Sequence, residues 1–133
     1  MDITNFPSVG DDLAVRALLA AYCQKVDDKD TAGVVALFSP DAALAMGEIE
    51  HTGRDAISAF YTAVAANPPG KHLTTNIIVA AVGGNRFNVA SDFAFVRKTD
   101  DGGYAFARVG RYLDVVERKG SEYWFARREM VFL

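Results

Sequence analysis

The N-terminal part of the chain repeats apolar residues every three or four positions, which is the spacing of one face of an α-helix. The first stripe of this kind consists of Val15, Leu18, Leu19, Tyr22 and Val26. Asp11 or Asp12 stands just before it and can cap the helix, because a carboxylate accepts hydrogen bonds from the free N–H groups of a first turn. Residues 1–10 are expected to form a flexible arm ahead of a single folded domain at residues 11–133.

Two shorter helices are expected further along the chain. The first of them starts at a capping Thr31 and ends at residues 39–41, because proline cannot continue a helix and restricts the residue before it. Its apolar residues are Val34, Val35, Leu37 and Phe38. The other opens at residues 53–55, and Asn-Pro-Pro-Gly at 67–70 stops it. Its apolar residues are Ile57, Phe60, Tyr61 and Val64. Short strands are expected between these helices at residues 42–46 and 49–52.

After residue 70 the pattern changes to long runs rich in Val, Ile, Phe, Tyr and Thr, which are typical of β-strands. The runs cover residues 71–82, 86–98, 103–118 and 122–133. Helices followed by such a meander predict an α+β domain with the helices on one face of an antiparallel sheet. Some runs are apolar on both faces, as around Ile77 and Ile78, so we expect a homodimer formed through the sheet.

Composition narrows the classes of function. The chain has 133 residues, a net charge of −3 and a single cysteine. A net negative charge is not the basic excess that is typical of nucleic-acid-binding proteins. The chain also has no run of about 20 apolar residues, the length needed to span a bilayer. No cluster of Cys and His has zinc-site spacing, and there is no phosphate loop or G-x-S-x-G nucleophile motif. We therefore expect no metal site. The opening residues do not resemble a signal peptide, so we expect a cytoplasmic protein.

A few polar residues stand where the pattern expects apolar ones. Tyr22 falls inside the apolar stripe of the first helix, and Asp27 lies at its edge, whereas Asp28 points to the opposite side. Asp27 either projects inward or simply ends the helix. His72 opens a strand and shares a face with Thr74 and Asn76 through the two-residue alternation. It is either a pocket residue or a hydrogen-bonded structural histidine.

Two further candidates lie in the later strands. Asp92 interrupts an apolar run, where it can line a pocket or face water. Arg127 and Arg128 are adjacent, so only one of them can point into the interior. That arginine could anchor a substrate oxygen or hold Asp27; alternatively, both are surface charges.

Five segments together resemble the SnoaL-like family of the nuclear transport factor 2-like superfamily. They are AYCQKVDDKDTAGVVALFSPDA, HTGRDAISAF, KHLTTNIIV, GRYLDVVER and YWFARREM. The resemblance covers residues 11–132. It implies a cone-shaped, curved antiparallel sheet wrapped around three N-terminal helices and enclosing one pocket.

The resemblance also implies roles for individual residues. In the dehydratase and dehydrochlorinase branch of the superfamily, a histidine and an aspartate form a dyad, which matches His72 and Asp27 here. Tyr22 matches a pocket tyrosine or lysine of that branch. Arg128 matches a late arginine if Tyr123 takes the family's aromatic position; if Trp124 takes it, the arginine assignment shifts.

The resemblance thus implies a lyase or isomerase that needs no cofactor, in which His72 is the general base and Asp27 orients it. Tyr22 and Arg128 would complete the catalytic set, with Asn76 and Asp92 as candidate substrate-binding residues. The expected substrate is a small, mostly apolar oxygenated ring compound. The alternative is a non-catalytic binding protein or accessory subunit, such as the small subunit of an aromatic-ring dioxygenase.

Overall fold

The computed structural model describes residues 1–133, which form three helices and one six-stranded sheet. The helices are α1 (Val9–Asp27), α2 (Thr31–Val35) and α3 (Arg54–Ala65). The strands are β1 (Phe38–Met46), β2 (Ile49–Thr52), β3 (Gly70–Gly83), β4 (Arg86–Lys98), β5 (Tyr104–Lys119) and β6 (Glu122–Phe132). The predicted α+β architecture, with helices before the long strands, is confirmed.

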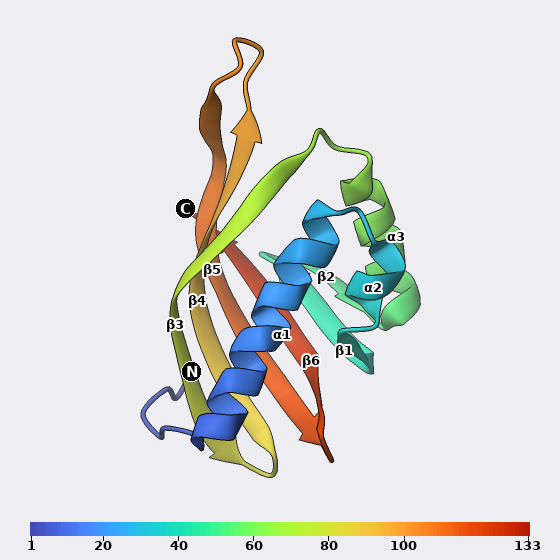
Figure 1. The fold of residues 1–133 in the computed structure, drawn as a ribbon. Coiled ribbons are helices and arrows are strands. Elements are labelled where there is room, and N and C mark those ends of the chain that lie inside the picture. Colours follow the sequence, from blue (N-terminus) through green and yellow to red (C-terminus); the bar gives the residue numbers. More distant parts are fainter.

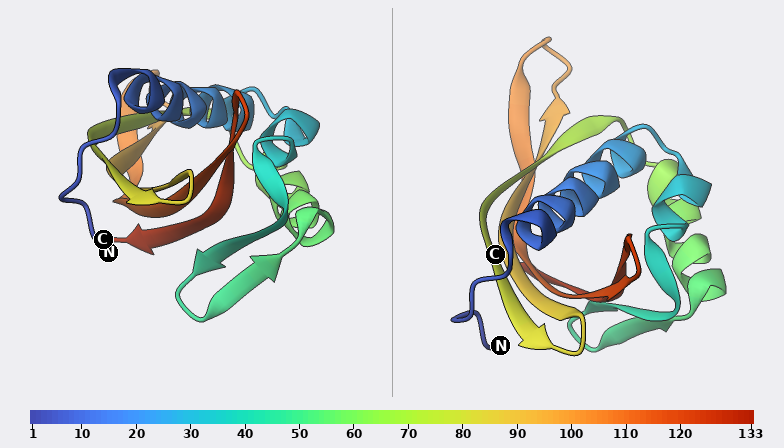
Figure 2. Two further views of the ribbon diagram at one scale, coloured as in Figure 1. Left: turned by 90° about the horizontal axis from the view of Figure 1, so that it is seen from below. Right: turned by 60° about the horizontal axis from the view of Figure 1, so that its bottom comes forward.

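The strands follow the order β2-β1-β6-β5-β4-β3, so β2 and β3 form the two edges of the sheet. All neighbours are antiparallel except β1 and β6, which run parallel. The sheet is curved, and α1 lies across its hollow face while α2 and α3 stand beside β1 and β2 (Figures 1 and 2). The hairpin between β4 and β5 extends beyond the body of the molecule (Figure 1).

The predicted apolar stripe of α1 is confirmed as part of the core. Val15, Leu19 and Tyr22 are each at most 1% exposed and pack against the hollow face of the sheet. Because every second side chain of a strand points to that face, the inward residues of β3 to β6 supply the other half of the core. None of the three helices is long and apolar enough to cross a membrane.

The start of α1 differs from the prediction. Ser8 is the N-cap, since its hydroxyl accepts a hydrogen bond from the backbone N–H of Asp11, and the helix begins at Val9. The Asp11 carboxylate instead accepts hydrogen bonds from Tyr123 and Arg118 and thereby ties α1 to the far strands. The arm before the helix is also attached to the sheet.

Two hydrogen bonds make this attachment. The backbone N–H of Ala81 donates to the carbonyl of Asn5 at 2.8 Å, and the side-chain amide of Asn88 donates to the carbonyl of Asp2 at 3.0 Å.

The second helix is also shorter than predicted. Asp30, not Thr31, caps it by accepting from the N–H of Gly33. Phe38 belongs to β1, where it is fully buried and pairs with Phe125 of β6. The pairing is irregular between Phe38 and Ala43, so Pro40 lies in β1 at a place where its missing N–H interrupts no regular ladder. Tertiary pairing has thus overridden the helical spacing.

The outer face of the sheet exposes apolar side chains. Leu73 of β3, Ala94 of β4 and Val109 of β5 are register partners in one row, and Leu73 and Val109 are 53% and 41% exposed. Ile78 and Val131 are exposed nearby at 41% and 44%. The homodimer remains a prediction that this face makes physically reasonable.

Sedimentation velocity checks the dimer. We expect the mass of two chains at micromolar concentration, and we expect Val109→Glu to shift the protein to one chain because it places a charge in the apolar row. A wild-type protein that stays a single chain at micromolar concentration would remove the prediction.

Candidate functional site

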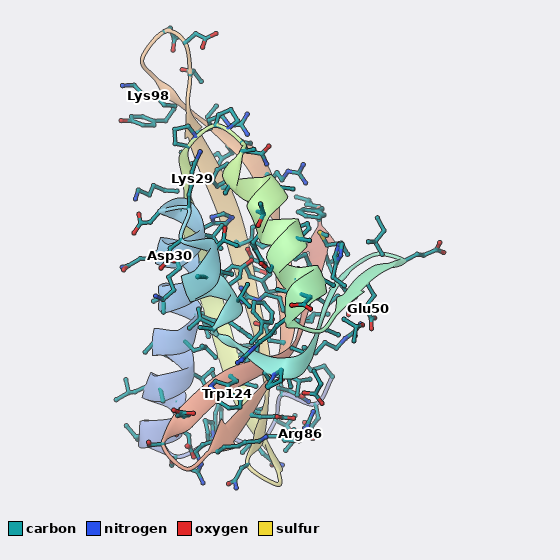
Figure 3. The ribbon with its side chains drawn as sticks, turned by 90° about the vertical axis from the view of Figure 1, so that its right-hand side faces the viewer. Lys29, Asp30, Glu50, Arg86, Lys98 and Trp124 are labelled. Atoms are coloured by element: carbon teal, nitrogen blue, oxygen red, sulfur yellow. The ribbon has the colours of Figure 1, made fainter.

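A cavity of about 380 Å³ opens between the C-terminal end of α1, α3 and the inward face of the sheet. Its lining residues are Tyr22, Val26, Asp27, Lys29, Met46, Phe60, Tyr61, Val64, Asn67, Pro68, Pro69, Gly70, His72, Phe93, Phe95, Arg97, Arg108, Tyr112, Met130 and Phe132. Lys29 lies near the end of the molecule that carries Lys98 and the β4–β5 hairpin, whereas Trp124 and Arg86 lie toward the opposite end (Figure 3). A cavity of this size and aromatic character suits a small organic molecule.

The structure brings Asp27 and His72 together in this cavity. The Nδ1 atom of His72 lies 2.6 Å from Oδ1 of Asp27. The backbone N–H of His72 also donates to the two carboxylate oxygens, at 3.0 and 3.2 Å. The side chains are 4% exposed for Asp27 and 16% exposed for His72. Because an ionised carboxylate only accepts hydrogen bonds, Nδ1 is the donor in this contact, and Nε2 is the ring nitrogen without a partner in the protein.

Local structure explains this placement. Asp27 is the last residue of α1, and β3 is an edge strand, so the N–H of His72 is available to a carboxylate rather than to another strand. Two residues earlier, a Cβ at Gly70 would come within 2.4 Å of the Phe95 ring and 2.5 Å of the Val96 carbonyl oxygen. Glycine therefore lets β3 begin close against β4, and His72 then packs on Phe95 with the ring centroids 4.7 Å apart.

Tyr22 reaches the cavity together with a residue that sequence analysis did not select. Its hydroxyl is 2.5 Å from that of Tyr61 on α3, and both residues are buried and line the cavity. Burial raises the pKa of Tyr22 and raises that of Tyr61 well above the usual value, so both remain neutral phenols. The sequence signal for Tyr61 was a hydroxyl on the apolar face of α3, but a tyrosine there is equally suited to simple packing.

Arg128 faces inward, but its partner is not Asp27, and it does not line the cavity. Its Nε and Nη2 atoms donate to the two oxygens of Asp114 on β5 at 2.8 and 2.9 Å, and both residues are at most 1% exposed. The predicted contact with Asp27 is therefore wrong, and the structure does not support the predicted contact with a substrate oxygen. Arg127 points to the other face, where it pairs with Glu50 at 3.1 Å.

Aromatic rings enclose the Arg128–Asp114 pair. The guanidinium carbon of Arg128 lies 4.2 Å from the Tyr22 ring, 3.7 Å from the Tyr112 ring and 4.4 Å from the Phe125 ring. Burial alone would lower the pKa of Arg128, but the Asp114 carboxylate outweighs burial and raises it, so the guanidinium stays charged. The pair therefore packs directly beneath the ring of Tyr22. Asp114 was missed although it interrupts an apolar strand in the same way as Asp92.

Asn76 and Asp92 lie outside the cavity, so the structure does not support their predicted contact with substrate. Asn76 has a φ of +53° at a register shift between Thr75 and Ile78, and this bulge breaks the alternation that placed it beside His72. Its amide donates to Asp92 at 2.8 Å, and Arg111 donates to the same carboxylate at 2.6 Å. The three residues form a polar network on the outer face.

The single cysteine and the second histidine of the chain are not arranged for chemistry. Cys23 is buried with its sulfur 3.1 Å from the Thr74 hydroxyl, and burial raises the pKa of its thiol. His51 of β2 packs against Phe60, with ring centroids 5.1 Å apart, and does not line the cavity.

Sequence comparison assigns the family. The profile of the SnoaL-like domain matches residues 7–129, most of the chain. This chain belongs to the SnoaL-like family. No curated protein shows significant sequence similarity to this SnoaL-like chain.

Solved structures share the fold of this SnoaL-like domain. A Mycobacterium tuberculosis protein of unknown function is 26% identical over 92% of this chain and 72% of its own, with a TM-score of 0.85. A Novosphingobium aromaticivorans protein described as a candidate aromatic ring hydroxylase is 28% identical over 96% and 92%, with a TM-score of 0.81. A candidate scytalone dehydratase from the same organism is 23% identical over 92% and 84%, with a TM-score of 0.82, and shows the fold alone.

Proposed function

We propose that this protein is a lyase or isomerase that needs no cofactor and acts on a small oxygenated ring compound, with His72 as its general base. The observation that carries the proposal is the 2.6 Å contact between Nδ1 of His72 and the nearly buried carboxylate of Asp27, at the wall of a cavity. This contact leaves Nε2 as the nitrogen that can accept a proton from a bound molecule.

The proposed reaction begins when Nε2 removes a proton from a carbon next to a carbonyl group. The electron pair of the broken C–H bond forms an enolate, and Asp27 stabilises the imidazolium that results. In an isomerisation the proton returns from Nε2 to another carbon. In an elimination the electron pair forms a C=C bond while a hydroxyl on the next carbon leaves, taking the imidazolium proton to depart as water.

The rest of the cavity supports this chemistry. Tyr22 and Tyr61 are neutral, so one hydroxyl of the pair can donate to an enolate or leaving oxygen while the other donates to its partner. The rings of Phe93, Phe95 and Phe132 line the same cavity as His72 and provide apolar walls for a ring compound. Positioning by such walls supplies much of the rate that a single base cannot.

The fold does not choose between enzyme and accessory subunit. A neighbouring structure is described as the β subunit of a candidate aromatic-ring-hydroxylating dioxygenase, but at 17% identity it shows the fold alone. What favours catalysis is the dyad, because an imidazole oriented by a carboxylate lines a cavity rather than a packed core.

Proton exchange tests the proposal without knowledge of the natural substrate. Small cyclic ketones and β-hydroxyketones are incubated with the protein in D₂O, and NMR follows deuterium incorporation and loss of the hydroxyl. We expect catalysed exchange in wild type and in His51→Ala, and loss of exchange in His72→Ala, because His72 lines the cavity and His51 does not. Exchange that persists unchanged in His72→Ala would contradict the proposal.

A further inference from the structure

Two arginines of the cavity wall have no hydrogen-bond or ion-pair partner. The chain has nine arginines, and six of them form ion pairs with carboxylates. Arg54 donates two hydrogen bonds to the Phe38 carbonyl. Arg97 and Arg108, which both line the cavity, make no hydrogen bond or ion pair within the protein. Guanidinium groups without a carboxylate partner at a cavity are suited to bind an anion from solution.

The environment of Arg97 strengthens this observation. Its Nε atom is buried without a hydrogen-bond partner. A buried donor left unpaired costs free energy, and such groups in native structures usually have a partner that is a ligand, an ion or water. The central carbon of the guanidinium lies 5.9 Å from the centroid of the Phe95 ring. Arg97 thus lies near an aromatic ring while its buried donor lacks an acceptor.

Charge in the cavity also favours an anion. Besides the two arginines, Lys29 lines the wall and donates to the Asn67 carbonyl at 2.7 Å. Asp27 is the one acidic residue of the lining, and its carboxylate already accepts hydrogen bonds from His72. The cavity is therefore locally basic although the whole chain has a net charge of −3.

Strand register fixes how this basic group lies relative to the dyad. His72 of β3, Phe95 of β4 and Arg108 of β5 are successive partners in one row across the sheet. Neighbouring strands are about 4.8 Å apart, so the backbone positions of His72 and Arg108 are separated by about 10 Å with Phe95 between them. Arg97 is two residues from Phe95 and shares its inward face. An aromatic platform thus lies between the proposed base and the two cations.

We propose that the substrate carries a carboxylate, which Arg97 and Arg108 bind while its ring lies over Phe95 and its acidic C–H faces His72. This inference rests on the proposed function, since it assigns the substrate class of the same cavity. A carboxylate matches the observations because its two oxygens fit the planar fork of a guanidinium and can supply the missing acceptor for Arg97. Arg97 and Arg108 are then specificity residues, and His72 remains the catalytic base.

A matched pair of probes tests this assignment by equilibrium binding alone. Benzoate and benzamide have nearly the same shape and differ by one negative charge. Calorimetric titration at low ionic strength is expected to show at least about tenfold tighter binding of benzoate to wild type, because a charge-assisted hydrogen bond is stronger than a neutral one. The Arg97→Gln/Arg108→Gln double variant is expected to bind both probes equally.

Two controls make the outcome specific. Arg127→Gln removes one positive charge from the outer face, where that arginine pairs with Glu50, and should keep the preference for benzoate. His72→Ala should also keep the preference, so failure of the catalytic proposal remains distinguishable from failure of this one. Circular dichroism of the double variant and of each single arginine variant establishes that folding is intact. Equal binding of the two probes to wild type, no benzoate binding at millimolar concentration, or an unchanged preference in the double variant would each overturn the inference.

Discussion

Asparagine in place of Asp27 is expected to lower the turnover rate by about 10²–10⁴-fold while the protein stays folded. The amide oxygen can still accept the backbone N–H of His72, which preserves the start of β3. An amide, however, carries no charge to stabilise an imidazolium, and its NH₂ group can donate to Nδ1 and move the ring proton to Nε2. The base would then present the wrong tautomer. Steady-state kinetics on a substrate found by proton exchange, with thermal unfolding monitored in parallel, measures both effects.

The effects of removing Asp27 and of removing His72 on the turnover rate should not multiply. If Asp27 acts only through His72, the Asp27→Asn/His72→Ala double variant should be no slower than His72→Ala alone, because the residues work as one unit. Asp28→Asn is the matched control, since Asp28 is the exposed neighbour that follows the helix. Independent, multiplicative losses in the double variant would show that Asp27 has some role other than orienting the imidazole.

Alanine at Arg128 is expected to lower the free energy of unfolding by about 3–5 kcal/mol. The substitution would leave the carboxylate of Asp114 buried without its bidentate partner, and three aromatic rings would lose the group they enclose. Urea denaturation followed by circular dichroism gives the free energy. Arg127→Ala is the control one residue away; its ion pair with Glu50 is on the surface, so its loss should cost about 1 kcal/mol or less.

A compensating variant separates charge from packing. Arg128→Met combined with Asp114→Leu removes both charges and keeps much of the volume, so it should recover much of the stability lost in Arg128→Ala. Equal destabilisation by Arg128→Ala and Arg127→Ala would instead mean that the buried pair contributes little to folding.

Sequence reasoning worked best where one periodicity governs a whole element. The stripe through Val15, Leu19 and Tyr22 predicted the buried face of α1, and runs of β-branched and aromatic residues predicted the four long strands. The juxtaposition of Asp27 and His72, expected from family resemblance, also appears in the structure. These features follow from local spacing or from a motif that the chain retains.

The errors come from effects that spacing does not encode. Alternation placed Asn76 beside His72, but one bulge residue with positive φ reverses every face assignment beyond it. The partner of Arg128 depends on the register of β5 against β6, which pairs it with Asp114. Phe38 left its helical position because a parallel pairing with β6 buries it completely. Arg97 and Arg108 could be selected only from the structure, which shows that both line the cavity and that neither pairs with a carboxylate.

The carboxylate of Asp27 has two simultaneous tasks, since it holds both the ring and the backbone amide of His72. Fraying of the first residues of β3 would therefore release the imidazole at the same moment as it opens the sheet edge. The pairing of the first residues of β3 and the correct orientation of the imidazole for proton transfer are therefore gained and lost together. The solvent-exchange rate of one amide hydrogen, that of His72, would then report how often the site is assembled.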